Sequence, residues 1–304
     1  MPPSFVHAAY NLTRAAVRRL GVRNPLAKPP MPTNLQVPPA TTADIAYQVD
    51  YAITNGSLYR DRLKDMGIDI AGARILEVGP GIAFGGMAWL RAAGAEVAVT
   101  DRWLAAWSDP FHGPVYSALA DKLDGVSGFD VAPLRQMVAD KGYSESTIRC
   151  IYSAAEDLSA IGDGAFDAVV SNAVLEHIKD EHKSFAELFR ITRPGGVGLH
   201  QVDFRDHRNF DRPLEHLLLP KEKFEAINDA VHAEFGSQRR QPDYAAALTG
   251  AGFVIEHYER NDQVSASYVE DLLRRLKESG RPIPPAWTAE ALADVGGLFR
   301  LRRP

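Results

Sequence analysis

One segment, residues 75–86 (ILEVGPGIAFGG), constrains the fold of this chain more than any other. An apolar stretch runs directly into a Gly-Pro-Gly turn, and a second apolar stretch with helical character follows it. Glycines at such a turn let a ligand approach the backbone, and the N-terminus of the next helix offers free N–H groups to an anionic ligand. The segment therefore predicts a strand, a ligand-binding turn and a helix in that order.

The rest of the chain repeats this alternation. Apolar stretches typical of strands lie at 74–78, 96–100, 147–153, 166–171, 197–204, 253–258 and 297–302. Helical patterns lie at 85–93, 181–192 and 244–249. Strands that alternate with helices predict a mostly parallel sheet covered on both faces. We therefore expect a doubly wound, seven-stranded α/β domain over 68–304, with long insertions at 103–146 and 205–243 covering the carboxyl edge of the sheet.

The first 67 residues precede that domain and are expected to form an arm. A helical pattern at 4–20 is followed by six prolines within 24–40 and by a second helical pattern at 44–66. Residues 1–43 contain no Asp or Glu. A packed arm, a membrane-surface or transit segment and a lid over the site are therefore open interpretations of the N-terminal segment.

Composition excludes several classes of protein. A chain of 304 residues with 45% hydrophobic residues can bury a large core. Cys150 is its single cysteine, which excludes an internal disulfide and a zinc site built from cysteines. The net charge of −5 argues against a general nucleic-acid binder. With no apolar run near the roughly 18–20 residues of a membrane helix, we expect no stable membrane insertion and a cytoplasmic location, and we leave a homodimer open.

An acidic residue follows the glycine turn at the sequence distance typical of a ribose-binding carboxylate. Asp101 ends the second predicted strand, 20 positions after Gly81. A carboxylate at that place can accept both ribose hydroxyls of an adenosine. By the residues alone, a nicotinamide cofactor and S-adenosylmethionine are both compatible with this pattern.

Several ordered motifs resemble one family. The turn with its preceding acid, residues 77–81 (EVGPG), resembles the first motif of the class I S-adenosylmethionine-dependent methyltransferases, of the type 11-like kind. Residues 166–178 (FDAVVSNAVLEHI), 190–196 (RITRPGG) and 251–257 (AGFVIEH) resemble later motifs of that family. The resemblance covers about residues 68–260, and the Tyr-x-x-x-Lys of short-chain dehydrogenases is absent.

The resemblance implies a site for S-adenosylmethionine. Asp101 would take the ribose hydroxyls, Glu77 would meet the amino end, and Asn172 would face the methyl group. Ala154 stands where the family often has a carboxylate for the adenine amine, so Glu156 or a backbone carbonyl would replace it. The implied cofactor contacts are Glu77, Gly79, Gly81, Asp101, Arg102, Ala155, Glu156 and Asn172.

The segment 200–207 (HQVDFRDH) follows the fifth predicted strand and carries the candidate catalytic groups. Its His200, Asp203, Asp206 and His207 could supply a base, bind a divalent metal or only form a hydrogen-bonded loop. We expect no metal site. His177, shortly after Asn172, either points into the pocket or packs against the sheet. The candidate catalytic residues are His200, His207 and His177.

The segment 200–207 also resembles one in methyltransferases associated with bacterial saccharide modification. The resemblances imply methyl transfer to a small-molecule acceptor, with oxygen in a sugar or another hydroxylated metabolite as the expected site. Nitrogen and carbon acceptors remain open. A protein that binds the cofactor without methyl transfer, as a sensor or scaffold, is the alternative.

The N-terminal arm is expected to help close the acceptor pocket, with Tyr47, Tyr51 and Tyr59 contributing aromatic groups.

Overall fold

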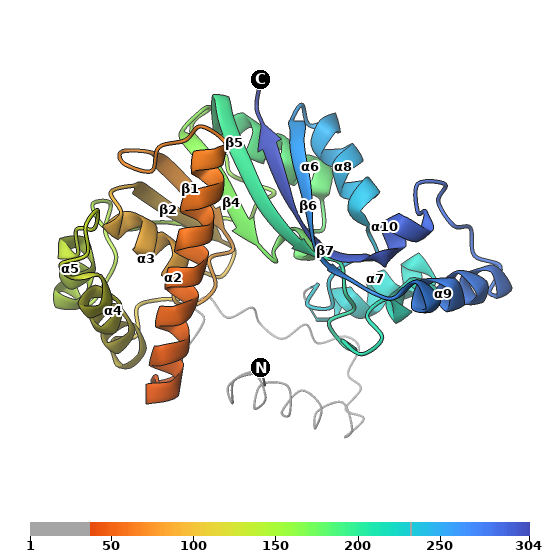
Figure 1. The fold of residues 1–304 in the computed structure, drawn as a ribbon, viewed down its shortest axis with the longest axis horizontal. Helices are drawn as coiled ribbons and strands as arrows, with labels where there is room; N and C mark the ends of the chain where they lie inside the picture. The colour runs from red at the N-terminus through yellow and green to blue at the C-terminus, as the bar shows by residue number, and fades with distance from the viewer. Residues whose placement is uncertain (1–36, 232) are drawn as a thin grey trace.

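The computed structural model describes residues 37–231 and 233–304, and Figure 1 shows their arrangement. The helix predicted at 4–20 and most of the proline-rich segment lie outside the described residues.

A single mixed sheet forms the centre of the molecule. Its strands, in the order in which they lie side by side, are β3, β2, β1, β4, β5, β7 and β6. Among the described strands, β7 runs in the direction opposite to all the others and is antiparallel to both of its neighbours, β5 and β6. The predicted seven-stranded, mostly parallel sheet is thus confirmed. The strand bounds are β1 Arg74–Val78, β2 Glu96–Asp101, β3 Arg149–Tyr152, β4 Phe166–Asn172, β5 Thr192–Asp203, β6 Val254–Gln263 and β7 Asp294–Arg302.

Helices cover both faces of the sheet, which makes the domain doubly wound (Figure 1). On β1, Ile75 packs into the apolar cluster under one helix layer, whereas Leu76 and Val78 pack into the cluster on the opposite face. Parallel central strands read as nearly continuous apolar runs because both of their faces are buried. The helices on the two faces are α2 Thr42–Asp65, α3 Gly85–Ala92, α4 Asp109–Leu123 and α5 Ala132–Asp140 on the first, and α6 Glu181–Ile191 and α8 Gln241–Gly250 on the second.

Helix α2 belongs to the core of the domain. It begins with a capping box between Thr41 and Asp44. It then crosses α3 closely, because small residues lie at the contact. A Cβ on Gly56 would come within 2.6 Å of the Trp89 ring, and a Cβ on Gly85 would come within 2.9 Å of Ala52.

The two long insertions lie at different ends of the sheet (Figure 1). The first carries α4 and α5, and α4 contacts the glycine turn: His112 Nε2 lies 2.8 Å from the carbonyl oxygen of Ile82, and the Tyr116 hydroxyl donates to that of Ala83. The second follows β5 and carries the short helix η2 Glu215–Leu218 and α7 Lys221–Asp229.

No helix in the described part of the chain has both the length and the apolar character needed to cross a bilayer.

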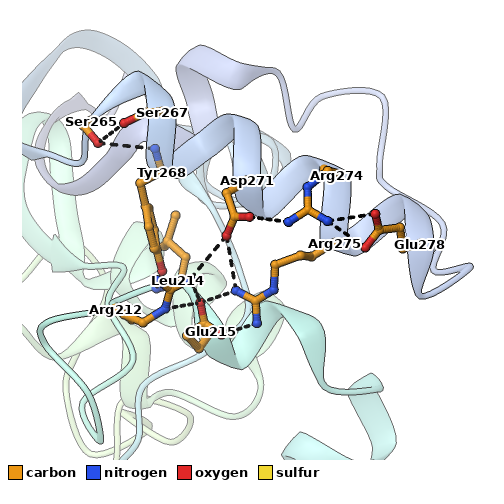
Figure 2. A network of polar contacts seen from close by, with 10 residues as sticks. All are labelled: Arg212, Leu214, Glu215, Ser265, Ser267, Tyr268, Asp271, Arg274, Arg275 and Glu278. Atoms are coloured by element: carbon orange, nitrogen blue, oxygen red, sulfur yellow. Dashed lines mark hydrogen bonds and ion pairs between the residues drawn. The ribbon is translucent and has the colours of Figure 1, made fainter.

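A third insertion, between β6 and β7, was not anticipated from the sequence. It carries α9 Ala266–Glu278 and α10 Ala289–Ala293, and it packs against the second insertion. Figure 2 shows the polar network that joins the two. Both guanidinium Nη atoms of Arg275 on α9 donate to the carboxylate of Glu215 on η2, each at 2.7 Å, and the Tyr268 hydroxyl accepts from the Leu214 amide at 3.0 Å. The second and third insertions therefore form one unit.

Candidate active site

The glycine turn after β1 has the open backbone that a ligand needs. Gly79 and Gly81 adopt positive φ angles of 68° and 70°, a region that side chains disfavour. A Cβ on Gly79 would collide with the side chain of Val174. A Cβ on Gly81 would meet no described atom within 4 Å. The backbone at Gly81 is therefore accessible to a ligand, whereas Gly79 allows the segment after β4 to pack against the turn.

Glu77 lies in front of this turn and is almost completely buried, at 6% exposure. Its Oε1 accepts a 2.8 Å hydrogen bond from the hydroxyl of Tyr59 on α2. Burial raises the pKa of Glu77 to about 7, and the Tyr59 hydrogen bond partly opposes that rise. A cationic group beside this carboxylate would be bound tightly, because the charge is poorly solvated there.

Asp101 ends β2, next to the turn. Its Oδ1 accepts a 2.7 Å hydrogen bond from the backbone amide of Trp103, and burial raises its pKa. Arg102 donates a 3.1 Å hydrogen bond to Glu156, which brings two predicted cofactor residues together. Ala155, beside Glu156, is buried.

Asn172 ends β4 at the same edge of the sheet. Its side-chain amide donates a 3.1 Å hydrogen bond to the hydroxyl of Tyr51 on α2. The next residue, Ala173, has a positive φ of 54° and donates its amide to the carbonyl of Gln201 on β5. The chain turns sharply here, and this turn brings Val174 against Gly79.

The structure gives His200 a packing role, which corrects the expectation that it is a candidate base. His200 lies inside β5, is fully buried, and its Nδ1 is 2.8 Å from the Ser171 hydroxyl on β4. Burial lowers the pKa of His200 to about 4. An acceptor has no path to a fully buried imidazole, so His200 is not placed to take its proton.

The acids of segment 200–207 are held by neighbouring arginines. Asp206 is buried and bound at both oxygens by Arg208, at 2.8 and 2.7 Å. Asp203 is bound by Arg205 in the same manner. Burial alone would raise the pKa of Asp203, but hydrogen bonds from His207 and Arg205 outweigh burial and lower it. His200, Asp203, Asp206 and His207 therefore do not form one metal or base site. His200 is bound to Ser171 and Asp206 to Arg208, so only Asp203 and His207 remain near each other.

His207 and His177 do come together, and Glu176 joins them. The two imidazole rings lie 5.1 Å apart, and Glu176 Oε1 is 4.0 Å from His177 Nε2. Glu176 and His177 belong to the short helix η1 Leu175–His177, after β4, whereas His207 follows β5. We call Glu176, His177 and His207 the His–Glu cluster. Burial lowers the pKa of His177 and raises that of Glu176 well above its usual range.

A cavity of about 660 Å³ adjoins the His–Glu cluster at Glu176. It lies between the end of η1, the second insertion and the third insertion, rather than at the glycine turn. Phe224, Ile283 and Trp287 supply apolar walls, and charged residues of both signs, Lys179 and Asp229 among them, also line the cavity. A volume of this size accommodates a small molecule.

The sequence reasoning missed two contributions to this site. The first is Glu176, which nothing in the local sequence singles out from other acids. Its burial depends on the second insertion, which no local pattern predicts. Tyr59 was expected near an acceptor, but it contacts Glu77. The sequence did contain a sign that Tyr51 and Tyr59 face the same part of the domain, because their spacing places them on one side of a helix.

The sheet order, the glycine turn and the acid at the end of β2 form the arrangement in which doubly wound α/β folds bind adenosine-containing cofactors. Residues 112–199 match the protein family described as "Methyltransferase domain". This part of the chain therefore resembles methyltransferases, which agrees with the S-adenosylmethionine site that the glycine turn and its neighbouring motifs imply.

Two curated relatives are ubiquinone biosynthesis O-methyltransferases. The protein from Chromobacterium violaceum is 29% identical over 156 residues, which span 47% of this chain and 66% of the relative. The protein from Thiobacillus denitrificans is 24% identical over 206 residues, which span 63% of this chain and 74% of the relative. The chain therefore spans slightly less than two thirds of the first relative and about three quarters of the second.

Solved structures resemble the chain only at a low level. An S-adenosylmethionine-dependent methyltransferase from Mesorhizobium loti has a TM-score of 0.46 and 17% identity, over 81% of this chain and 97% of that one. Phosphoethanolamine N-methyltransferase 2 from Haemonchus contortus has a TM-score of 0.47 and 16% identity, over 87% and 57%. Similarities of this size carry no weight in the assignment.

Proposed function

We propose that this methyltransferase transfers a methyl group to an oxygen of a small hydroxylated molecule. The observation that carries the proposal is the His–Glu cluster, which lies shortly after Asn172, at the carboxyl edge where a doubly wound sheet keeps its site. Both curated relatives are O-methyltransferases by name, which agrees with oxygen as the acceptor atom.

The residues around the glycine turn would hold the cofactor. The open backbone at Gly81 fits a ligand that lies against the turn, and the buried carboxylate of Glu77 fits the amino group of the methionyl part. Asp101 has one oxygen bound by the Trp103 amide, which leaves the other for the ribose hydroxyls. Bound S-adenosylmethionine supplies an activated methyl group, so the protein mainly has to align the acceptor and remove a proton.

The His–Glu cluster would deal with that proton. As the new C–O bond forms and the C–S bond breaks, the acceptor oxygen must lose its hydrogen as H⁺. His177 Nδ1 lies 2.7 Å from the carbonyl oxygen of Ala233, so a neutral ring keeps its proton on Nδ1 and its lone pair on Nε2. The lowered pKa of His177 keeps the imidazole neutral at physiological pH, as a general base requires.

The cavity beside Glu176 would hold the body of the acceptor. Its apolar walls at Phe224, Ile283 and Trp287 favour an acceptor with an apolar or planar face. Such a face occurs in a phenol, and one side of a sugar ring also packs on an aromatic ring. Because segment 200–207 resembles one in saccharide-modifying enzymes, we include sugars among the proposed acceptors.

Turnover with methyl-labelled S-adenosylmethionine tests this function. The acceptor panel contains matched phenols, sugars and amines, and the position of the label is read by mass spectrometry and NMR. We expect labelled ethers. His177→Gln should lower the turnover number by roughly 100-fold or more, as expected for loss of a general base, while His257→Gln, at an exposed position, serves as the control. Labelled amines, or an unchanged turnover number in His177→Gln, would contradict the proposal.

A sensor or scaffold that binds the cofactor without methyl transfer is the alternative of a different class. The labelled turnover separates the two, because a sensor would bind S-adenosylmethionine and its demethylated product in a calorimeter but would leave the label in place with every acceptor.

A further inference from the structure

Three potential metal ligands converge at the carboxyl edge of the sheet. One ligand atom each from Glu176, His177 and His207 lies within 4.8 Å of the others. Two of these residues come from η1 after β4, and the third comes from the loop after β5. The sheet therefore brings together residues that are 30 positions apart in the sequence.

Glu176 is the least expected member of this group. Its side chain is 1% exposed, and no side chain in the described part of the chain donates a hydrogen bond to it; the backbone amides of Glu176 and Asp203 act on the carboxylate and oppose the rise of its pKa. His207 Nε2 has one long contact, 3.5 Å to Asp203 Oδ2. A buried carboxylate without a side-chain partner is costly, and a cation is one of the few groups that compensate it.

The two histidines are oriented in the manner of metal ligands. Nδ1 of His177 lies 2.7 Å from the carbonyl oxygen of Ala233, and Nδ1 of His207 lies 3.2 Å from that of Glu234. A carbonyl can only accept, so in a neutral ring each Nδ1 carries the proton and Nε2 of His177 keeps its lone pair. Nε2 of His207 faces Asp203 Oδ2 at 3.5 Å, so His207 can bind an ion only in its neutral form, with Nε2 turned from Asp203 to the ion. Metal-bound histidines almost always donate their other ring nitrogen to a carbonyl or carboxylate in this way.

We propose that Glu176, His177 and His207 form a binding site for one divalent transition-metal ion. Two imidazoles and a carboxylate favour Zn²⁺, Fe²⁺ or Mn²⁺ over Mg²⁺ and Ca²⁺, which prefer all-oxygen sites. Ligand atoms about 2.1 Å from an ion lie about 3.4 Å apart at tetrahedral angles. The observed separations of up to 4.8 Å would need to close by up to about 1.4 Å through side-chain rotation.

The site would be open rather than structural. Three protein ligands leave a position for water or for an oxygen of the acceptor, as in catalytic metal sites. Asp203 Oδ2 lies 3.5 Å from His207 Nε2, but Arg205 binds this carboxylate, so Asp203 fits a supporting role better than that of a fourth ligand. With the ion bound, Nε2 of His177 is a ligand and no longer the base, and the ion itself would make an acceptor hydroxyl more acidic, so that its proton passes to solvent. This last step rests on the proposed function, whereas metal binding does not.

Metal binding is tested on the full chain without cofactor or acceptor. The protein is stripped with a chelator and titrated with Zn²⁺, Mn²⁺ or Mg²⁺ in a calorimeter, and bound metal is counted by elemental analysis. We expect one Zn²⁺ or Mn²⁺ per chain and much weaker Mg²⁺ binding. Co²⁺ in the same site should show visible ligand-field bands. Glu176→Gln and His207→Gln should each weaken binding roughly tenfold or more, and the exposed His257→Gln should not.

Thermal melting gives a second readout that folding defects cannot mimic. In chelator, Glu176→Gln should melt at or above the temperature of the wild type, because it removes a poorly compensated buried carboxylate. With saturating Zn²⁺, the order should reverse, because only the wild type gains from binding. A wild type that binds no more metal than Glu176→Gln, or melting curves that metal does not reorder, would overturn the site. Either result leaves the test of methyl transfer independent, because that test measures label in an acceptor.

Discussion

The hydroxyl of Tyr59 donates a 2.8 Å hydrogen bond to Oε1 of Glu77, and this bond joins helix α2 to the strand that leads into the glycine turn. Both side chains are buried. Burial brings the pKa of Glu77 to about 7, and the Tyr59 hydroxyl prevents a further rise. A residue outside the recognisable motifs thus controls whether the carboxylate proposed to meet the cofactor is charged at neutral pH.

Tyr59→Phe is expected to weaken S-adenosylmethionine binding and to shift its pH dependence upward. Without the hydroxyl, the pKa of Glu77 rises further, so a larger fraction is protonated at pH 7 and cannot attract the amino group. Loss of a hydrogen bond to a charged group costs about 1.5–3 kcal/mol. Calorimetry from pH 6 to 9 checks this, with the exposed Tyr47→Phe as the control. If the pH midpoint of binding stayed where it is in the wild type, Tyr59 would not control Glu77.

The two glycines of the turn should respond differently to the same substitution. Gly81→Ala places a Cβ in open space, so it should cost only the backbone strain of a positive φ, about 1 kcal/mol. Gly79→Ala adds a collision with Val174 and should destabilise the fold more. Denaturant unfolding measures both values. Val174→Ala should rescue part of the loss in Gly79→Ala and none of the loss in Gly81→Ala.

Gly81→Ala should still impair cofactor binding strongly, because its new methyl group lies where the ligand is proposed to approach the backbone. A Gly81→Ala protein that folds and binds S-adenosylmethionine with wild-type affinity would remove the turn from the proposed site.

Asp101→Ala should weaken cofactor binding by about 1–3 kcal/mol, because a partly desolvated acceptor of the ribose hydroxyls is lost. Burial raises the pKa of Asp101, which shows that water does not compensate the carboxylate fully. The exposed Asp140→Ala on α5 is the matched control. Calorimetry in which NADH binds tightly and S-adenosylmethionine does not would count against the assigned cofactor as a whole.

The sheet was predictable from sequence because its signals are local. Buried parallel strands give apolar runs, and the turn at Gly79 and Gly81 has its own chemistry, so both appear in consecutive residues. The partners of the site residues are not local. Glu176 is buried by the second insertion, and Tyr59 reaches Glu77 from another element, so no pattern near either acid signals its environment.

His200 is the reverse case: the sequence favoured it as a site residue, and the structure does not. A histidine near a strand end, next to acids, resembles a base, but the register of β5 on β4 sets His200 opposite Ser171, inside the sheet. Side chains alternate between the two faces of a strand, so orientation depends on register, and register is fixed only when the strands pair.

His200→Leu should preserve turnover and change the pH dependence of stability. The pKa of His200 is about 4 in the fold, against about 6.5 in an unfolded chain. The unfolded state therefore binds more protons between these values, and stability falls as the pH drops from about 6.5 to 4, by up to about 3 kcal/mol for this group. His200→Leu should lose that part of the slope. Denaturant unfolding at pH 4.5–8 measures it, and a loss of turnover as large as that expected for His177→Gln would restore His200 as a base.

Truncation of the N-terminus tests where the folded unit begins. The division at residue 67 remains a prediction, but α2 buries Val49, Ala52, Tyr59 and Leu63 in the cluster shared with the sheet. Deleting 1–67 removes these side chains, each worth about 1–3 kcal/mol when buried, and total stability is typically only about 5–15 kcal/mol. We therefore expect the shortened chain to lose its cooperative unfolding transition and its cofactor binding together, whereas a simple lid would affect only the KM of the acceptor.

Deleting 1–36 is the matched control, because it keeps α2 and its capping box. The Val37 carbonyl still accepts from the Ser108 hydroxyl, and the Ala40 amide still donates to Pro110. We expect this chain to melt within a few degrees of the full protein and to bind S-adenosylmethionine equally well. Circular dichroism melts and calorimetry compare the three chains. If the chain without residues 1–67 folds and binds the cofactor, α2 is an appendage, and the contact between Tyr59 and Glu77 has no part in binding.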